Sequence, residues 1–253
     1  MLSKNQIKEI QFLQLKKFRD KDRLFIVEGI KTSLELIQLK PEIITHIFCT
    51  DHFYKNHKSA LLKFTAILHQ VNEEELKKIS LHENPNEVLL VAKYLHPKKF
   101  DFNFEKDFTL YLDDVRDPGN MGTIMRLADW FGLQQIIASP NSCDFYNPKV
   151  IQASMGAFLR MSVIYDELSN VLQTQNIKNV YGALLNSQSL YQEKLKGGLI
   201  VIGNEANGIH PDNIKHISHP ITIPAAQGNG TESLNAAMAT SIIVAEFYRQ
   251  LKL

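Results

Sequence analysis

The sequence has few cysteines and no long apolar run, and both features narrow the classes of protein it can belong to. Only Cys49 and Cys143 occur in the 253 residues, 94 positions apart, so there is neither a disulfide framework nor a CxxC pair. We interpret them as ordinary thiols of a reducing cytosol. Apolar stretches such as 88–92 and 242–245 are far shorter than the roughly 20 residues that span a bilayer. These features predict a cytoplasmic protein without a membrane span.

Several common functional motifs are also missing. The N-terminus contains lysines and no uninterrupted apolar segment, which argues against a signal peptide. No GxGxxG, GKS or GKT sequence is present, so neither a dinucleotide-binding fingerprint nor a P-loop is supported. His210, His216 and His219 do not have the spacing of metal ligands, and we therefore expect no bound metal.

Basic residues are concentrated in the first part of the chain. Residues 1–100 have a net charge of +5, from 17 Lys and Arg against 12 Asp and Glu, whereas residues 101–253 have a net charge of −4. This asymmetry indicates a polyanion-binding module joined to a second domain, with a solvated helix face as the alternative interpretation. The candidate residues for binding a polyanion are Lys16, Lys17, Arg19, Lys21, Arg23 and Lys31.

The pattern of apolar residues predicts two α/β domains. The first spans 1–95, with helices over 6–18, 32–39 and 73–79 and strands over 25–27, 43–50, 64–68 and 88–92. Residues 96–107 change in character, with charges alternating with phenylalanines, and are interpreted as a linker whose phenylalanines dock on one of the domains.

The second domain, 108–253, shows a clearer alternation of strands and helices. Strands are predicted over 109–112, 135–138, 163–165, 180–184, 199–202 and 221–223, and helices over 120–131, 148–158, 168–175 and 233–251. Strands separated by crossover helices imply a mainly parallel sheet, with its ligand site at the carboxyl ends of the strands.

Polar and glycine-rich segments follow three of these strands. The first, 113–122, contains Asn120, which by itself fits a helix N-cap, and is followed by Arg126, which by itself fits a solvated helix residue. The second contains Gly203, Asn204, Glu205 and Gly208, and the third runs from Ile223 to Asn235. Because parallel strands deliver all three segments to one edge, we expect a single cleft there, with little hydrophobic lining.

Taken together, these motifs resemble those of the SpoU–TrmH family, which are SPOUT-superfamily RNA ribose 2′-O-methyltransferases that use S-adenosylmethionine. The matching residues are N-x-G-x-x-x-R at Asn120, Gly122 and Arg126, G-N-E-x-x-G at 203–208, and I-P…E-S-L-N at 223–235. The resemblance implies a deep trefoil knot in the C-terminal domain and an L30e-like fold for the N-terminal, RNA substrate-binding domain. It also implies a homodimer through the knotted domain.

The resemblance further implies roles for individual residues. The catalytic set is Arg126, Asn120, Glu205, Ser233 and Asn235, and the cofactor-binding set is Gly203, Asn204, Gly208, Ile223 and Leu234. One departure is the segment Ala225–Thr231, whose seven residues exceed the family's usual five. Arg126 either acts as a base or clamps the phosphate and hydroxyl, and the clamp is physically easier because guanidinium stays protonated.

Two other functions compete with this interpretation. A non-catalytic RNA-binding protein for ribosome assembly could keep the same fold, and other SPOUT branches methylate base nitrogens, although they lack this motif set. Among RNA substrates, the separate N-terminal domain favours 23S rRNA over tRNA by analogy.

Overall fold

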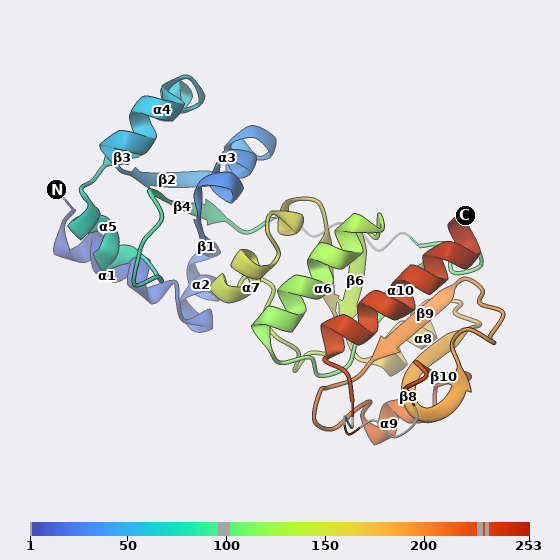
Figure 1. Cartoon of the computed structure of the whole chain (residues 1–253). Helices are drawn as coiled ribbons and strands as arrows, with labels where there is room; N and C mark the ends of the chain where they lie inside the picture. The colour runs from blue at the N-terminus through green and yellow to red at the C-terminus, as the bar shows by residue number, and fades with distance from the viewer. Residues whose placement is uncertain (1, 96–101, 227–229, 231–232) are drawn as a thin grey trace. The chain divides into compact units, whose positions relative to one another are not determined.

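The computed structural model describes residues 2–95, 102–226, 230 and 233–253. The chain forms two compact units (Figure 1). The first combines the described residues of 1–96 with Asp144–Leu159, and the second combines those of 97–143 with Arg160–Leu253. Asp144–Leu159 therefore belongs with the first unit, although the sequence pattern predicts it to be part of the second. Residues 96–101 of the expected linker lie outside the described residues.

The first unit is built on a four-stranded mixed sheet. Its strands are β1 (Leu24–Glu28), β2 (Ile44–Cys49), β3 (Leu68–Gln70) and β4 (Val88–Lys93), in the order β1-β4-β2-β3. β4 pairs antiparallel with β1 and β2, and β2 pairs parallel with β3. The strand predicted over 64–68 is misplaced along the chain. Leu62–Phe64 forms a 3-10 turn, and the strand begins at Leu68.

The helices of this unit are α1 (Lys4–Phe12), α2 (Lys16–Asp22), α3 (Ile30–Leu39), α4 (Asp51–Leu61), α5 (Glu73–Ile79) and α7 (Pro148–Ala153), with further 3-10 turns at Pro41–Ile43 and Ala157–Leu159. The single helix predicted over 6–18 is two helices, and α4 was not predicted. α7 is shorter than the predicted 148–158 because Met155 and Gly156 have φ values of 49° and 92°, which end a right-handed helix.

Asp144–Leu159 completes the packing of the first unit. The rings of Tyr94 and Tyr146 stack with centroids 3.6 Å apart, and the Leu95 N–H donates to the Tyr146 hydroxyl oxygen over 2.7 Å. Phe25 packs edge-on against Phe158 at 5.8 Å. Burial raises the pKa of Tyr146 to about 12. The unit is therefore assembled from two separate stretches of sequence.

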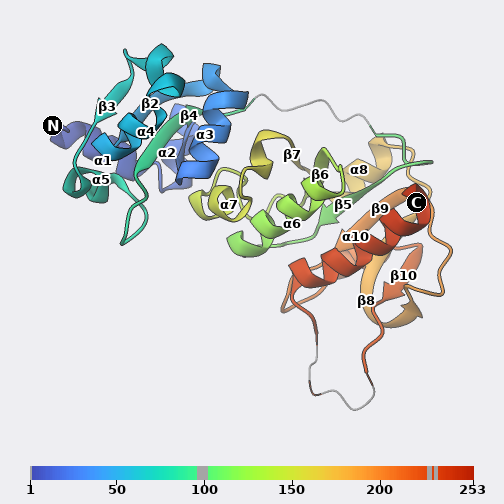
Figure 2. The same ribbon diagram turned by 45° about the horizontal axis from the view of Figure 1, so that its top comes forward.

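The second unit contains a six-stranded sheet in which every pairing is parallel (Figure 2). The strands are β5 (Phe108–Leu112), β6 (Gln135–Ala138), β7 (Ser162–Tyr165), β8 (Val180–Ser189), β9 (Gly198–Ile202) and β10 (His219–Thr222), in the order β10-β8-β9-β5-β6-β7. The predicted mainly parallel sheet is confirmed. The central strands β5 and β9 are buried along their whole length, as their apolar sequences predict.

The helices described in this unit are α6 (Pro118–Trp130), α8 (Leu168–Thr174), α9 (Pro211–Ile214) and α10 (Ala236–Lys252). α6 and α10 lie side by side (Figures 1 and 2). Phe104 is buried in a core cluster with Tyr111 and Leu199, and Phe102 packs against it, so the phenylalanines after residue 101 dock on the second unit, as the sequence predicts. Within the described residues, no helix combines the length and apolar character that a membrane crossing needs.

The cysteines match their prediction. Both are free, Cys49 is buried and Cys143 is half-buried. Burial raises the pKa of the Cys49 thiol to about 11, which keeps it protonated and unreactive at neutral pH.

Candidate functional site

The segment after β5 places Asn120 inside the fold instead of at a helix cap. α6 begins at Pro118, and the side chain of Asp117 caps it by accepting from the Asn120 N–H over 2.8 Å. The N-cap interpretation of Asn120 is therefore wrong. Asn120 lies within the first turn and is only 9% exposed, so its side-chain amide is available for tertiary contacts.

Asn120 joins the other two polar segments. Its amide nitrogen donates to a carboxylate oxygen of Glu205, after β9. Its amide oxygen accepts from the side-chain amide of Asn235, at the start of α10, over 2.9 Å. The Asn235 oxygen in turn caps α10 by accepting from the Ala237 and Met238 N–H groups. Three residues far apart in sequence thus form one connected hydrogen-bond network, as expected for loops at one sheet edge.

The segment after β9 is held in shape by its own side chains. The Asn204 amide nitrogen donates to the Asp114 carbonyl over 2.9 Å, while its oxygen accepts from the Ala206 and Asn207 N–H groups. The oxygen and one N–H of the Asn204 side chain are therefore engaged within the protein, so this residue positions the loop.

The two glycines of this segment have different roles. A side chain at Gly203 would lie 2.3 Å from the backbone of Gly208 and Ile209, so only glycine allows this close approach. Gly208 has a φ of 68°, and it exchanges two backbone hydrogen bonds of 2.9 Å with Asn204. The turn is therefore closed tightly on itself.

Asp113 is a supporting residue that the sequence motifs do not single out. It directly follows β5 and is 2% exposed, and its carboxylate accepts from the His210 N–H over 2.7 Å. This bond fixes the far end of the second segment, just before α9. Its position directly after a buried apolar strand is the feature of the sequence that could have identified Asp113 as a supporting residue.

The third segment is only partly described. Residues 227–229, 231 and 232 lie outside the described residues, and with them most of the expected long segment Ala225–Thr231. Ser233 and Leu234 are exposed, and α10 begins at Ala236, three residues after the predicted start. Among the described residues, the hydrogen-bond network includes Asn235 and not Ser233.

A pocket of about 830 Å³ lies among the second and third segments, β8 and α10. Gly203, Asn204, Gly208, Ile223, Leu234 and Ser233 all contribute to its lining, so the predicted cofactor residues are brought together. The expectation of little hydrophobic lining is wrong, because the wall also includes Leu184, Ile202, Ile209, Ile214, Ile221 and Ile243. A pocket of this size and character suits a small ligand with a large apolar part.

A break in the sheet helps to form this pocket. β10 pairs with Tyr181 and Gly182 of β8 through His219 and Pro220, then shifts to Gln188 and Ser189. Residues 183–187 of β8 therefore have no partner in β10, and Asn186 among them has a φ of 56°. Ala183, Leu184 and Leu185 line the pocket as a result. The sequence pattern predicts an uninterrupted strand over 180–184 and gives no sign of this break.

Arg126 lies outside both the pocket lining and the network. It is exposed on α6, and within the described part of the chain no hydrogen bond or ion pair engages its guanidinium. It shares a helix face with Thr123 and Trp130, which is 84% exposed. Its charge is therefore presented to solvent one and a half turns after Asn120.

The six candidate RNA-binding residues divide into two groups. Lys16, Lys17, Lys21, Arg23 and Lys31 are exposed in the first unit. Arg19 is only 2% exposed, and its guanidinium donates to the Leu13 and Gln14 carbonyls and to the Asp144 carboxylate, the last over 2.6 Å. A buried guanidinium with these partners cannot reach an external phosphate, so the assignment of Arg19 to the RNA-binding surface is corrected.

The described residues contain no group of three or more His, Cys, Asp or Glu side chains that could hold a metal ion. The imidazole of His219 lies 3.2 Å from the Glu193 carboxylate, and His210 caps α9. These two histidines therefore have local structural partners.

Proteins of known family are similar to this chain over almost its whole length. A protein from Bacillus subtilis, 23S rRNA (guanosine(2553)-2′-O)-methyltransferase RlmP, is 27% identical over 248 residues, covering 96% of each chain. A solved structure assigned to the TrmH family of RNA methyltransferases, from Porphyromonas gingivalis, is 34% identical, with a TM-score of 0.81 and 99% of each chain covered.

A second solved structure, an AdoMet-bound rRNA methyltransferase from Sinorhizobium meliloti, is 26% identical with a TM-score of 0.86, covering 100% of this chain and 97% of that one. Residues 4–90 match the MRM3-like substrate binding domain, and residues 107–245 match the SpoU rRNA Methylase family. The second match covers more than half of the sequence and contains Asn120, Arg126, Glu205 and Asn235, and on this basis the chain belongs to the SpoU rRNA Methylase family.

Proposed function

We propose that this protein transfers the methyl group of S-adenosylmethionine to a ribose 2′-hydroxyl of 23S rRNA. The observation that carries the proposal is the network through Asn120, which joins Glu205 and Asn235 next to an apolar pocket. Family membership supports the reaction class, and the AdoMet-bound S. meliloti structure supports the methyl donor.

The residues of the pocket fit S-adenosylmethionine. Its apolar wall, including Leu184, Ile221 and Ile223, suits the faces of the adenine ring, and we assign the backbone groups of Gly203 and Leu234, which also line the pocket, to its polar edges. When bound, the donor supplies an electrophilic methyl group on a sulfonium. The chain's own contribution is to hold the two reactants in line and to exclude water from them.

Arg126 is the residue proposed to act on the RNA. Guanidinium remains protonated in proteins, so we assign it the role of a clamp that binds the adjoining phosphate and orients the 2′-hydroxyl. The hydroxyl proton then passes to a phosphate oxygen or to water. Asn120 and Glu205 fix the loops around α6, and Asn235 fixes the start of α10. Ser233, two residues before Asn235, is assigned to organising the third loop.

The first unit is proposed to bind the RNA substrate through Lys16, Lys17, Lys21, Arg23 and Lys31, which are all exposed. The match to the MRM3-like substrate binding domain supports this assignment. We further propose that this unit has an L30e-like fold. Phosphate contacts by lysine and arginine make RNA affinity fall steeply as salt concentration rises.

The second unit is proposed to form a homodimer and to contain the family's trefoil knot. Trp130 on α6 is 84% exposed and Met238 on α10 is 60% exposed, and large apolar side chains that are this exposed on adjacent helices favour burial against a second copy. We further propose that the protein acts in the cytoplasm, where its rRNA substrate is made.

Mapping 2′-O-methyl groups tests the proposed function. A deletion strain should lose one methylation in 23S rRNA, and the purified protein should restore it to rRNA from that strain with S-adenosylmethionine. Loss of a tRNA methylation would replace the proposed substrate. If all methylations persist while the protein still binds rRNA, the non-catalytic ribosome-assembly alternative is supported.

A further inference from the structure

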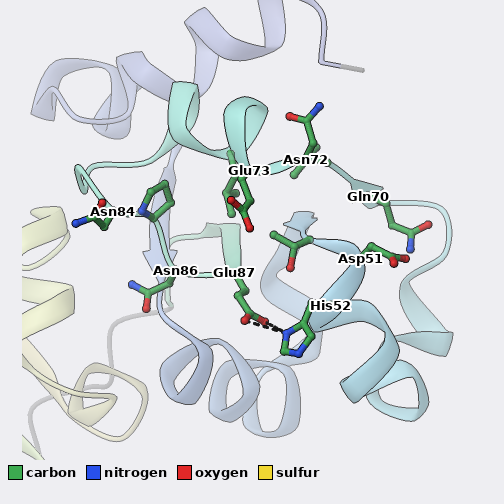
Figure 3. A pocket seen from close by; sticks show the side chains of 12 residues that line it. Asp51, His52, Gln70, Asn72, Glu73, Asn84, Asn86 and Glu87 are labelled. Carbon is green, nitrogen blue, oxygen red and sulfur yellow. Dashed lines mark hydrogen bonds and ion pairs between the residues drawn. The ribbon is translucent and has the colours of Figure 1, made fainter.

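The first unit contains a cavity of about 1030 Å³ that the proposed function does not use (Figure 3). It is formed by the start of α4, the turn between β3 and α5, the first turns of α5 and the segment before β4. All of its lining residues fall within Thr50–Glu87, so none is shared with the pocket of the second unit.

The lining combines apolar and hydrogen-bonding groups. Val71 and Leu76 are 6% and 2% exposed, and Pro85 is half-buried, so part of the wall is apolar. The side chains of Gln70, Asn84 and Asn86 bring amide groups that both donate and accept hydrogen bonds. A planar ring with polar edges can use both kinds of surface at once.

The charge of the lining selects against phosphate. Three carboxylates, Asp51, Glu73 and Glu87, contribute to it, and none of its described lining residues is lysine or arginine. Figure 3 shows the Glu73 carboxylate directed toward the middle of the ring of side chains, while both Glu87 oxygens lie 2.9 Å from His52 Nδ1. A ligand here must be uncharged or cationic, and N–H groups on its edge would be bound best.

The net charge of the whole unit favours RNA as the source of the ligand. Residues 1–95 carry 15 Lys and Arg against 12 Asp and Glu, so the unit is basic although this cavity is acidic. In single-stranded RNA the phosphates can contact surface lysines while an unstacked base turns inward, and proteins read such bases by stacking and by hydrogen bonds to their edges.

We propose that this cavity binds an unpaired nucleobase of the RNA substrate, preferably guanine or cytosine, whose edges carry amino groups that carboxylates accept. The inference rests on the proposed function, because the occupant belongs to the RNA that the enzyme methylates. It assigns base recognition to the first unit, in addition to the phosphate binding proposed for its lysines.

Nucleoside binding tests this without any use of methylation activity. The full-length ¹⁵N-labelled protein, saturated with S-adenosylhomocysteine to fill the donor pocket, is titrated with cytidine, guanosine and uridine at millimolar concentrations. We expect cytidine and guanosine to shift the side-chain amide signals of Gln70, Asn84 and Asn86, with smaller shifts for uridine. Cytidine 5′-monophosphate should bind more weakly than cytidine because of its phosphate.

A matched pair of substitutions provides the control. Asn84→Trp should fill the cavity and abolish the shifts, whereas Glu83→Trp, at an exposed neighbouring position outside the lining, should preserve them. Absence of shifts with every nucleoside overturns the proposal. So does binding of an arginine-rich peptide with no response to nucleosides, which would make the cavity a protein-binding site.

The consequence for the reaction is measured with rRNA from the deletion strain. Asn84→Trp should raise the RNA concentration for half-maximal methylation on the order of 10-fold, with kcat and donor affinity unchanged. If Asn84→Trp and Glu83→Trp need the same RNA concentration for half-maximal methylation, the cavity has no role in substrate binding. Failure of the wild-type protein to methylate any RNA would instead reject the proposed function, which the nucleoside titration does not depend on.

Discussion

The side-chain amide of Asn235 donates a 2.9 Å hydrogen bond to the side-chain oxygen of Asn120, across 115 positions of sequence. Because Asn120 also donates to Glu205, its two amide atoms are used by two different loops. An amide can do this because it presents a donor and an acceptor side by side, which neither a carboxylate nor a methyl group can. The network therefore requires asparagine at position 120.

Replacing Asn120 with aspartate tests this requirement. Asn120→Asp keeps the shape of the side chain but replaces its donor with an oxygen that faces the Glu205 carboxylate. Loss of a buried hydrogen bond costs about 1–3 kcal/mol, so we expect methyl transfer to fall about 10-fold or more and the melting temperature to fall too. Single-turnover methyl transfer and thermal unfolding measure the two effects.

The control is Asn141→Asp, the same change at an exposed position of the second unit. It should leave both measurements close to those of the wild type, since isolated surface substitutions alter stability by about 0.5 kcal/mol or less. Wild-type activity in Asn120→Asp would show that the network is dispensable for the reaction.

Arg19 is expected to contribute to stability and not to RNA affinity. Arg19→Met leaves the Asp144 carboxylate, whose side chain is 15% exposed, without its cation, and removal of one partner of such a pair costs about 3–5 kcal/mol. Lys17→Met, at an exposed position, should leave stability unchanged. It should make the slope of log RNA affinity against log salt concentration shallower, by about the amount that one phosphate contact contributes.

Urea unfolding and RNA binding at several salt concentrations distinguish the two variants. An Arg19→Met protein of wild-type stability that binds RNA poorly would return Arg19 to the RNA-binding surface. Point substitutions are preferable to deletion of residues 1–95, since deletion would remove the packing partners of Tyr146 and Phe158.

Much of the fold was predictable from sequence, for reasons visible in particular elements. β5 and β9 are continuous apolar runs because both faces are covered, and α5 matches its predicted bounds because Asn72 and Glu75 form a capping box at its start. α4 was missed because few residues of its sequence, DHFYKNHKSAL, are apolar, and because His57 departs from helical geometry.

Two of the errors in the candidate residues have a common cause, which is competition between local and distant partners. Asn120 fits an N-cap, but Asp117 precedes Pro118, a residue suited to the first helical position, and takes the cap. Arg19 resembles its exposed neighbours in sequence, yet its partner Asp144 lies 125 positions away. Neither outcome follows from local propensity, because both depend on tertiary contacts.

The last helix carries a pH-sensitive interaction. Hydrogen bonds from Arg249, together with one from Gln250, lower the pKa of Glu246 to about 2, against an ordinary value of 4.5. A lowered carboxyl pKa stabilises the fold above pH 4.5, and this stabilisation is lost as the pH falls toward 2. Arg249 is 63% exposed, so screening by solvent keeps the effect on stability small.

Unfolding by urea at several pH values measures this contribution. Glu246→Gln should be less stable than the wild type at neutral pH, and the difference should shrink as the pH falls below 4.5. A difference that stays constant down to the acid limit would show that packing, and not the charge of Glu246, accounts for the effect.

Arg126 provides the sharpest test of the proposed mechanism, because its position allows two different outcomes. It is exposed and unpaired within the described residues, so Arg126→Ala should change the free energy of unfolding by less than about 0.5 kcal/mol. If it clamps phosphate and hydroxyl in the transition state, methyl transfer should fall on the order of 10²-fold or more. Donor affinity should change by no more than a few-fold, since Arg126 is absent from the pocket lining.

Arg126→Lys separates charge from geometry. Lysine keeps the positive charge but lacks the planar fork that binds two oxygens at once, so it should restore little of the lost rate. Single-turnover transfer of a labelled methyl group, with donor binding by calorimetry, measures both quantities. A lysine variant of near-wild-type rate would refute the two-pronged clamp and leave only charge attraction. An alanine variant of full rate would remove Arg126 from the mechanism altogether. Other residues would then have to bind the phosphate and orient the hydroxyl.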